Sequence, residues 1–215
     1  MPDRAPSAGG TGSAADFIPP RPTLPALREA SRGCRGCHLY KVGTQTVFGE
    51  GTRRARVMFV GEQPGDVEDR EGRPFVGPSG LLLDRALDGA GIARDEVYVT
   101  NAVKHFKWER GEKSARRIHK KPNAAEVRAC RPWLEHEIAL VQPDVIVCLG
   151  ATAAQAVFGS AFKLMAQRGQ LLSSTASEKT LATLHPAAVL RAPDDTARRE
   201  AFRLLVEDLR TAKDA

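Results

Sequence analysis

Short apolar runs alternate along this chain with longer helical patterns, and this alternation is its strongest constraint on the fold. Four runs of five or six residues each are predicted to be buried strands: Arg56–Val60, Val97–Asn101, Asp144–Leu149 and Thr180–Leu184. Strand–helix–strand units place successive strands parallel and put helices on the faces of the sheet. The sequence therefore predicts an α/β fold with a mostly parallel sheet and helices on both faces.

The helical patterns between and around these runs predict five helices: Leu24–Ser31, Leu81–Ala90, Ala124–Val141, Ala151–Phe158 and Asp195–Thr211. Residues 163–177 are predicted to be a loop or a hairpin. Residues 1–22 are rich in Ala, Gly, Ser and Pro and are expected to form a flexible tail. The length of 215 residues suits one compact domain plus a tail, so residues 23–215 are expected to be a single domain.

Polar side chains follow three of the four predicted strands. Glu62 and Gln63 come just after the first strand, Asn101 ends the second, and His185 follows the fourth. Ligands in open α/β sheets bind at the carboxyl ends of the strands, which makes these residues candidates for a site. A strand-capping Asn and a hydrogen-bonded core His are the structural alternatives, whereas at a site the Asn101 amide suits the edge of a base.

The stretch 61–83 carries most of the candidate chemistry, although an ordinary βα loop is its alternative interpretation. Gly61 and Gly65 allow close backbone approach or positive φ. Phe75 lies outside any periodic run and is either a core residue or a plate on which a base stacks. Residues 77–80 open a helix whose free N–H groups suit a phosphate. An acidic segment lies between these features: Asp66, Glu68, Asp69 and Glu71.

Positive charge is concentrated in residues 103–121. This segment holds eight Lys and Arg and two Glu, which equals the whole formal excess of +6 in the protein. Such a loop favours a polyanion such as nucleic acid, and a solvated loop is the alternative. His119 lies within it and is either a further phosphate contact or, as a neutral imidazole, a competent nucleophile. The positive charges of Arg116, Arg117, Lys120 and Lys121 are expected to lower its pKa and keep it neutral.

The four cysteines form two pairs in the sequence. Cys34 and Cys37 make a C-x-x-C motif, and Cys130 and Cys148 are separated by seventeen residues. A four-thiolate metal site and buried free thiols are both consistent with this pattern. The spacing does not choose the metal, because it matches neither paired zinc knuckles nor the common ferredoxin arrangements.

The chain is expected to be a cytoplasmic, nucleoid-associated protein with no membrane partner. No apolar run reaches the length of a membrane span, and the first 16 residues lack the apolar region of a signal peptide. In that compartment the thiols are expected to be reduced or to bind metal instead of forming disulfides.

Several motifs together resemble the uracil-DNA glycosylase superfamily, and within it the iron–sulfur family 4 branch. The resemblance runs from about Cys34 to Leu209. It is carried by four segments: GEQPG at 61–65, GRPFVGPSG at 72–80, TNAVK at 100–104 and HPAAVLR at 185–191.

This resemblance implies a three-layer α/β/α sandwich with a four-stranded, mostly parallel sheet. It also implies that uracil is flipped out of the DNA strand into a pocket. The four cysteines match the cluster pattern of that branch, which implies a [4Fe–4S] cluster on Cys34, Cys37, Cys130 and Cys148.

The implied site roles follow the motifs. Phe75 would stack on uracil, Asn101 would read its Watson–Crick edge, and His185 would hydrogen-bond a carbonyl and stabilise negative charge on the leaving base. The pocket would also be lined by Gly61, Glu62, Gln63, Gly65, Asp66 and Asp69. The DNA backbone would be held by Ser79, Lys104, Arg116, Arg117, Lys120 and Arg191.

Two departures from family 4 resemble the UdgX-type subgroup, whose product is a covalent protein–DNA adduct. Gln63 stands where family 4 usually has Ala, and a basic loop ends in Arg116-Arg117-Ile118-His119. The implied function is a monomeric glycosylase that excises uracil from single-stranded or flipped-out DNA and is trapped through His119. Three rivals are a conventional turnover glycosylase, a non-catalytic nucleic-acid-binding module and an iron–sulfur redox protein on a flavodoxin-like sheet.

Overall fold

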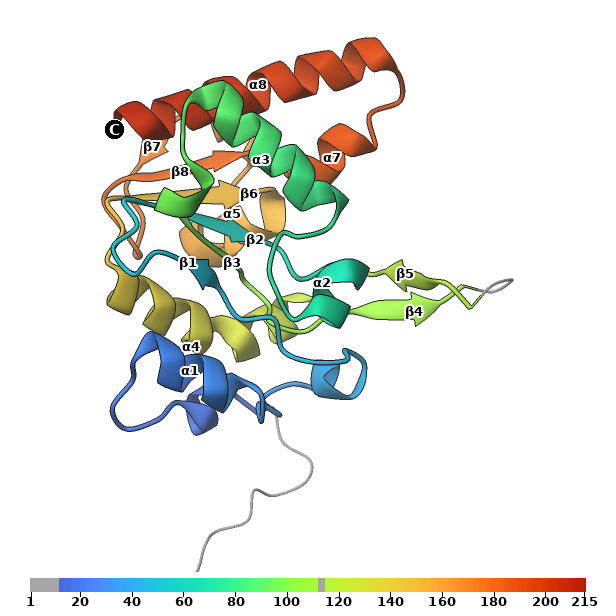
Figure 1. The fold of residues 1–215 in the computed structure, drawn as a ribbon, viewed down its shortest axis with the longest axis vertical. Coiled ribbons are helices and arrows are strands. Elements are labelled where there is room, and N and C mark those ends of the chain that lie inside the picture. The colour runs from blue at the N-terminus through green and yellow to red at the C-terminus, as the bar shows by residue number, and fades with distance from the viewer. Residues whose placement is uncertain (1–11, 112–114) are drawn as a thin grey trace, which may run out of the picture.

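The computed structural model describes residues 12–111 and 115–215, and their main sheet has six strands (Figure 1). Four central strands are parallel, in the order β3-β2-β6-β8. They are β2 (Val57–Gly61), β3 (Tyr98–Asn101), β6 (Val145–Leu149) and β8 (Thr180–Thr183). The predicted strands are thus confirmed to within one residue at each end. Antiparallel strands of two residues, β1 (Glu50–Gly51) and β7 (Leu171–Leu172), add the edges, so the sheet is larger than the four-stranded sheet that the resemblance implies.

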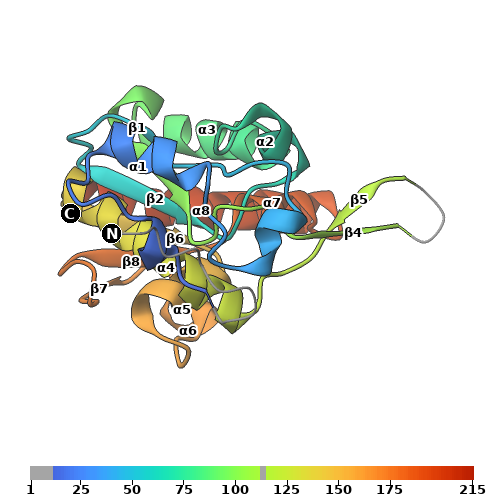
Figure 2. The same cartoon turned by 90° about the horizontal axis from the view of Figure 1, so that it is seen from below.

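Helices cover both faces of this sheet, so the three-layer α/β/α sandwich is confirmed (Figures 1 and 2). One face carries α3 (Pro78–Ala90), α7 (Pro186–Leu190) and α8 (Asp195–Asp214). The other carries α4 (Ala124–Val141) and α5 (Ala151–Phe158), with α1 (Leu24–Ser31) packed against α4. Alternate strand residues supply the two cores, because successive side chains point to opposite faces.

The remaining elements are short, and two of them correct the predictions. The acidic segment is a helix, α2, between Gly65 at its N-cap and Gly72 in the left-handed region, and its first-turn carboxylates complement the helix dipole. The basic loop contains the antiparallel β4–β5 hairpin, which projects from the body of the protein (Figure 2). The full set of remaining short elements is η1 (Ala14–Phe17), η2 (His38–Lys41), α2 (Asp66–Glu71), η3 (Arg94–Glu96), β4 (Trp108–Arg110), β5 (Arg117–His119) and α6 (Leu164–Gln167).

The predicted flexible tail is wrong for its last part. Residues 1–11 lie outside the described residues, but η1 packs against α4 and Ala14 is fully buried. A Cβ on Gly36 would lie 2.7 Å from the nitrogen of Ala14, so the glycine of the C-x-x-C motif makes room for this segment. Phe17 and Ile18 add apolar contacts that composition alone did not reveal. The packed region therefore begins before residue 23.

Helix limits otherwise agree closely with the predictions. α1, α4 and α5 have the predicted bounds, α3 begins three residues earlier, at Pro78, and α8 continues to Asp214. Residues 163–177, predicted as a loop or hairpin, contain α6 and the edge strand β7. Within the described residues no helix is both long and apolar enough to cross a membrane.

Candidate active site

The carboxyl ends of β2 and β3 meet at a tightly packed point. Gly61 ends β2 and lies beside Asn101 at the end of β3. A Cβ at position 61 would be 2.3 Å from Oδ1 of Asn101 and 2.6 Å from Cζ of Phe75. Since no larger residue fits, Gly61 allows the amide and the aromatic ring to converge on the strand ends.

The side chain of Asn101 has an unused acceptor. Asn101 is only 2% exposed, and within the described residues its Oδ1 is buried without a hydrogen-bond partner. Its backbone carbonyl is fixed by the Nζ of Lys104, which donates at 2.7 Å. Leaving a buried acceptor unpaired costs about 1–3 kcal/mol. A ligand that presents an N–H group to Oδ1 would recover this free energy.

Phe75 adopts a backbone conformation that bulky residues rarely take. Its φ is 55°, and the residue is 6% exposed. Such a conformation persists only where the surroundings impose it, and it clusters at functional sites. The centroids of the Phe75 and His185 rings are 6.3 Å apart, and the angle between the ring planes is 31°. Together with Asn101, the two rings present an aromatic and polar surface beside the strand ends.

His185 is fixed in one neutral tautomer. Its Nδ1 accepts the N–H of Ala187 at 3.1 Å and caps α7, so the ring proton is on Nε2. The pKa of His185 is lowered to about 4. Burial is the largest cause, and the nearby Arg191 and His119 contribute to the same lowering. At neutral pH this side chain is therefore an uncharged donor at Nε2.

The β4–β5 hairpin brings His119 to Gln63 and Glu62. The Nε2 of His119 is 2.9 Å from the Nε2 of Gln63 and 3.5 Å from Oε1 of Glu62. Oε1 of Gln63 accepts the N–H of Lys107 at 3.1 Å, so the amide nitrogen faces the imidazole and donates to it. The Nε2 of His119 is consequently an acceptor, with its lone pair directed at the amide nitrogen of Gln63.

The pKa of His119 is lowered, but not for the predicted reason. Burial is the largest cause, Glu62 opposes it, and Arg191 lowers the pKa further. The sequence instead assigned this effect to the charges on the basic loop: Arg116, Arg117, Lys120 and Lys121. At least two of these are offset, because Lys120 pairs with Glu109 at 2.9 Å and Arg117 binds two aspartates. The imidazole is neutral yet accessible, since its side chain is 49% exposed.

Arg117 anchors the hairpin to α2. Its guanidinium binds Oδ2 of Asp69 at 2.6 Å and also binds Asp66. Its Cζ lies 5.4 Å from the ring centroids of both Phe106 and Trp108. An Arg that is largely shielded from solvent, ion-paired to two carboxylates and stacked on two rings has a fixed geometry. The position of His119 at the end of β5 depends on this anchor.

The predicted roles of Asp69 and Arg117 are therefore wrong, whereas the pocket role of Asp66, whose side chain is 40% exposed, stays a prediction. Asp69 is fully buried and also accepts the N–H of Thr44 at 2.9 Å, so it does not line a substrate pocket. Asp66 is engaged by Arg117 and Arg70. Arg117 is 12% exposed in its side chain and is ion-paired, so it is not a phosphate contact.

Lys104 is a further correction. It is predicted to contact the DNA backbone, but it is fully buried and its Nζ is 2.5 Å from Oε2 of Glu137. Glu137 also accepts from Thr100 and from the hydroxyl of Tyr98, the latter at 3.0 Å. Burial and Glu137 raise the pKa of Tyr98. Lys104 thus belongs to a closed internal network behind Asn101.

The other predicted backbone contacts lie at or near the surface. Arg116 and Arg191 are exposed, Lys120 is partly exposed on the hairpin, and Ser79 lies in the first turn of α3. Gly65 caps α2, and its N–H donates to Oε2 of Glu68 at 3.1 Å, so this N–H is already used.

Three of the four cysteines lie together. One core cluster contains Cys34, Cys37 and Cys130. Burial raises the pKa of Cys130 to about 12, and the nearby Cys37 and Cys34 contribute to this increase. Trp133 donates to the sulfur of Cys34 at 3.3 Å, and the backbone N–H of Lys104 donates to that of Cys130 at 3.2 Å. Such donors suit thiolates that hold a metal cluster.

Cys148 lies elsewhere, so the predicted four-thiolate set is wrong. It is in the middle of the sheet, packed with Met58 and Val60, and burial alone raises its pKa. In the described part of the chain no three His, Cys, Asp or Glu side chains are grouped closely enough to hold a single metal ion. The three gathered thiols fit an iron–sulfur ligand set in their chemistry, and Cys148 does not.

Sequence reasoning missed two residues that position the site. The hydroxyl of Thr152 donates to Oε2 of Glu62. Thr152 follows β6, so the rule that selects residues at strand ends would have found it. Lys107 holds Gln63 through its backbone N–H and carbonyl, and contacts made by the main chain leave no signal in the side-chain sequence.

Comparisons with known proteins relate this chain to uracil-DNA glycosylases. A model of the uracil DNA glycosylase superfamily matches residues 48–210. The chain is 37% identical over 188 residues to the type-4 uracil-DNA glycosylase of Thermotoga maritima, covering 87% of this chain and 91% of that protein. It is 36% identical over 181 residues to the type-4 enzyme of Pyrobaculum aerophilum, covering 79% and 86%. The type-5 enzyme of P. aerophilum is 28% identical over 187 residues, covering 77% and 76%.

Proposed function

Because the chain belongs to the uracil-DNA glycosylase superfamily, we propose that it flips uracil out of DNA and cleaves the N-glycosidic bond. The observation that carries this proposal is the buried Oδ1 of Asn101, which has no hydrogen-bond partner among residues 12–111 and 115–215. The N3–H of uracil can donate to this oxygen, whereas N3 of cytosine carries no hydrogen. The glycosylases named above support the choice of uracil-containing DNA as the substrate.

The other strand-end residues have matching roles. Phe75 stacks on the flipped base, and Nε2–H of His185 donates to a uracil carbonyl oxygen. When the C1′–N1 bond breaks, its electron pair goes to the base and the sugar becomes oxocarbenium-like. A neutral donor held in place at the developing negative charge stabilises this transition state.

We further propose that His119 captures the sugar. Its Nε2 lone pair, oriented by Gln63 at 2.9 Å, attacks C1′ and forms a C–N bond. The amide hydrogen bond is released as this lone pair turns to carbon. The resulting imidazolium is offset by Glu62, whose Oε1 is 3.5 Å from Nε2 in the free protein, and it can lose its Nδ1 proton to solvent.

A conventional turnover glycosylase is the second candidate. Glu62 is held by Thr152, and its side chain is 20% exposed at the site, so its carboxylate could activate a water that attacks the same carbon. The two candidates differ only in what captures C1′, and one experiment separates them.

We propose that Cys34, Cys37 and Cys130 supply thiolates to an iron–sulfur cluster. Such a cluster would be structural and would tie the N-terminal segment to α4. The thiols lie in one core with Trp133, and this core contains none of the strand-end side chains that contact the base. No bond of the glycosylase reaction needs a redox step.

The test is denaturing electrophoresis after mixing the protein with a labelled uracil oligonucleotide. Wild type is expected to give one detergent-stable adduct per active molecule. His119→Ser and His119→Ala should lose the adduct, and His119→Ser should release uracil with turnover because water can enter. His136→Ser, on α4, is the matched control and should behave as wild type.

Three outcomes would count against the proposal. An adduct in both His119 variants would identify another nucleophile. Free turnover by wild type without an adduct would establish the conventional glycosylase. A wild-type protein that binds the oligonucleotide in a salt-sensitive manner but releases no uracil would be a binding module.

A further inference from the structure

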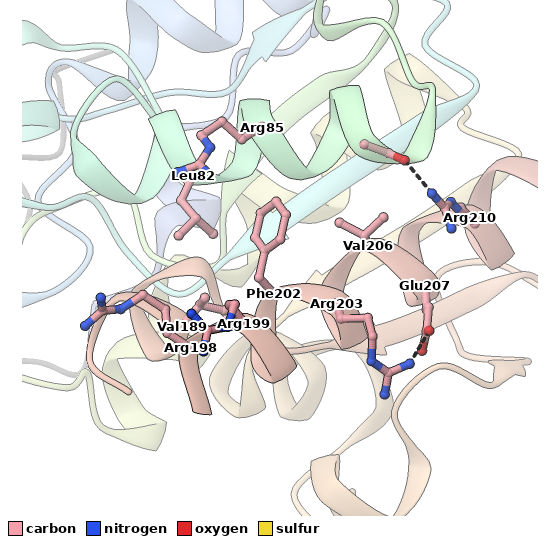
Figure 3. Close-up of a pocket in the computed structure, with 11 residues that line it drawn as sticks. Leu82, Arg85, Val189, Arg198, Arg199, Phe202, Arg203, Val206, Glu207 and Arg210 are labelled. Carbon is pink, nitrogen blue, oxygen red and sulfur yellow. Dashed lines mark hydrogen bonds and ion pairs between the residues drawn. The ribbon is translucent and has the colours of Figure 1, made fainter. Parts of the chain in front are cut away.

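A groove of about 470 Å³ lies between α3 and α8, beside α7 (Figure 3). This volume is within the range of about 300–1,000 Å³ typical of ligand pockets. None of its lining residues belongs to the strand-end site. They come from α3, α7 and α8.

The floor of the groove is apolar. Leu82, Val189 and Val206 are buried against the main core. Phe202 is only half-buried, and its ring stands between the two helices (Figure 3). The guanidinium of Arg85 lies 5.5 Å from the centroid of this ring. An aromatic face of this kind gains free energy when a further apolar group covers it.

The rim is strongly basic, with five arginines and one glutamate among the lining residues. Two of the arginines are ion-paired along α8: Arg198 with Asp195 at 2.8 Å, and Arg203 with Glu200 at 2.6 Å. Arg203 also pairs with Glu207 (Figure 3).

The other three rim arginines have no carboxylate partner within the described residues. Arg199 donates to the hydroxyl of Thr196 at 3.4 Å, and Arg210 donates to the carbonyl of Gly89 at 2.9 Å. Arg85 contacts only the Phe202 ring among the interactions described. Their guanidinium groups are exposed and can each bind a carboxylate bidentately.

We propose that this groove docks an acidic segment of a partner protein, with a bulky apolar side chain on Phe202 and carboxylates on Arg85, Arg199 and Arg210. An acidic segment with a bulky apolar side chain complements an apolar floor surrounded by arginines that have no carboxylate partner in the described part of the chain. The inference goes beyond the proposed function, because the groove shares no residue with the strand-end site.

Two other occupants fit the groove less well. DNA would use the arginines through its phosphates, but most such contacts are polar and leave the apolar floor uncovered. A second copy of this chain presenting the same groove would bring two arginine rims together, and like charges placed opposite one another are unfavourable.

The test uses fluorescence anisotropy with a fluorescein-labelled acidic peptide that carries two Phe at helical spacing. Saturable binding to the full chain is expected, and it should weaken at least about tenfold for the double variant Arg85→Glu/Arg199→Glu. The same peptide with Ser in place of Phe should lose a similar factor. Arg53→Glu/Arg54→Glu, an equal charge change at exposed residues outside the groove, should bind as wild type.

Uracil excision and thermal unfolding of both double variants should match wild type, which shows that they fold. The proposal would be overturned if both double variants bound the peptide equally well, or if both lost the same factor of affinity for it. It would also be overturned if replacing the Phe residues of the peptide left its affinity unchanged. The proposal would also be overturned if a uracil-free single-stranded oligonucleotide displaced the peptide and if its own binding were lost in Arg85→Glu/Arg199→Glu. Concentration-dependent self-association abolished by Arg85→Glu/Arg199→Glu would assign the groove to a second copy instead.

Discussion

Two polar regions lie back to back at the end of β3, and their polar atoms are satisfied to different degrees. Toward α4, Lys104 and Glu137 are both fully buried and bind each other at 2.5 Å. Toward the strand ends, three residues earlier than Lys104, the Oδ1 of Asn101 is equally buried but has no partner within the described residues. The first region is closed, and the second has an unused acceptor.

Whether a buried polar atom has a hydrogen-bond partner separates structural from functional polar groups better than residue type does. A buried charge persists when it is paired and hydrogen-bonded, and Lys104 meets that condition with protein atoms alone. Asn101 does not, so its unused capacity points to a ligand. By residue type alone, Lys104 belongs with the DNA contacts, and this is why its predicted role is wrong.

The largest expected effect concerns the thiols on the closed side. Cys130→Ser should abolish the bound iron and the visible absorption of the purified protein, because a hydroxyl is a poor cluster ligand. Cys148→Ala should keep both, since Cys148 lies among apolar side chains of the sheet. Iron analysis of anaerobically purified variants measures this. Loss of iron in Cys148→Ala would restore the four-thiolate set, and zinc in the wild type would remove the iron–sulfur proposal.

The next effect is on stability. Lys104→Met should reduce the free energy of unfolding by about 3–5 kcal/mol, because it leaves Glu137 as a buried, unpaired charge. Urea denaturation followed by circular dichroism measures it. Lys104→Met/Glu137→Met should recover much of the loss, whereas Lys120→Met, on the partly exposed hairpin, should change stability by less than about 1 kcal/mol. Equal effects at the two lysines would show that the closed region is not special.

Asn101→Ala tests the region that has the unused acceptor. It removes an acceptor without a protein partner, so the free energy of unfolding should not fall as it does for Lys104→Met. Uracil excision should slow by about 5- to 150-fold, which corresponds to about 1–3 kcal/mol of transition-state binding. Single-turnover excision and urea denaturation on the same preparation measure both quantities. A large loss of stability with normal excision would make Asn101 a structural residue.

The sequence predicted the fold well, because periodicity reflects burial directly. The strands β2, β3, β6 and β8 are buried along their whole length, so each reads as an apolar run. The β4–β5 hairpin and η1 were missed for the opposite reason. The hairpin is stabilised by Arg117 reaching Asp66 and Asp69 across about fifty positions of sequence, and no local pattern encodes such a contact.

The site was predicted only as far as position along the chain determines it. Strand ends located Gln63, Asn101 and His185, because the carboxyl edge of a parallel sheet is one place in space. Which charges are already paired depends on side-chain partners, and so the roles of Asp66 and Asp69 could not be read from composition. The same limit applies to Cys148, which counts as a fourth thiol in the sequence but faces the wrong core.

The smallest expected effect is a pH dependence that separates the two histidines of the open region. His119 must be neutral to attack C1′, and its pKa is lowered from the ordinary 6.5 mainly by burial. Adduct formation should therefore continue below pH 6.5 and decline only as the pH falls through this lower pKa. His185, with its pKa at about 4, should remain neutral over that range, so uracil release by His119→Ser should continue where the adduct declines.

Single-turnover rates of adduct formation and uracil release between about pH 4 and 8 measure this difference, which should stay below tenfold near pH 6. Arg191→Gln provides the matched change: Arg191 helps to lower the pKa of His119, so its removal should move the adduct profile toward higher pH. An adduct rate that already falls between pH 8 and 7 would mean that Glu62 dominates and raises the pKa instead. Two profiles that fall together would mean that one shared group controls both steps, and His119 would lose its separate role as the nucleophile.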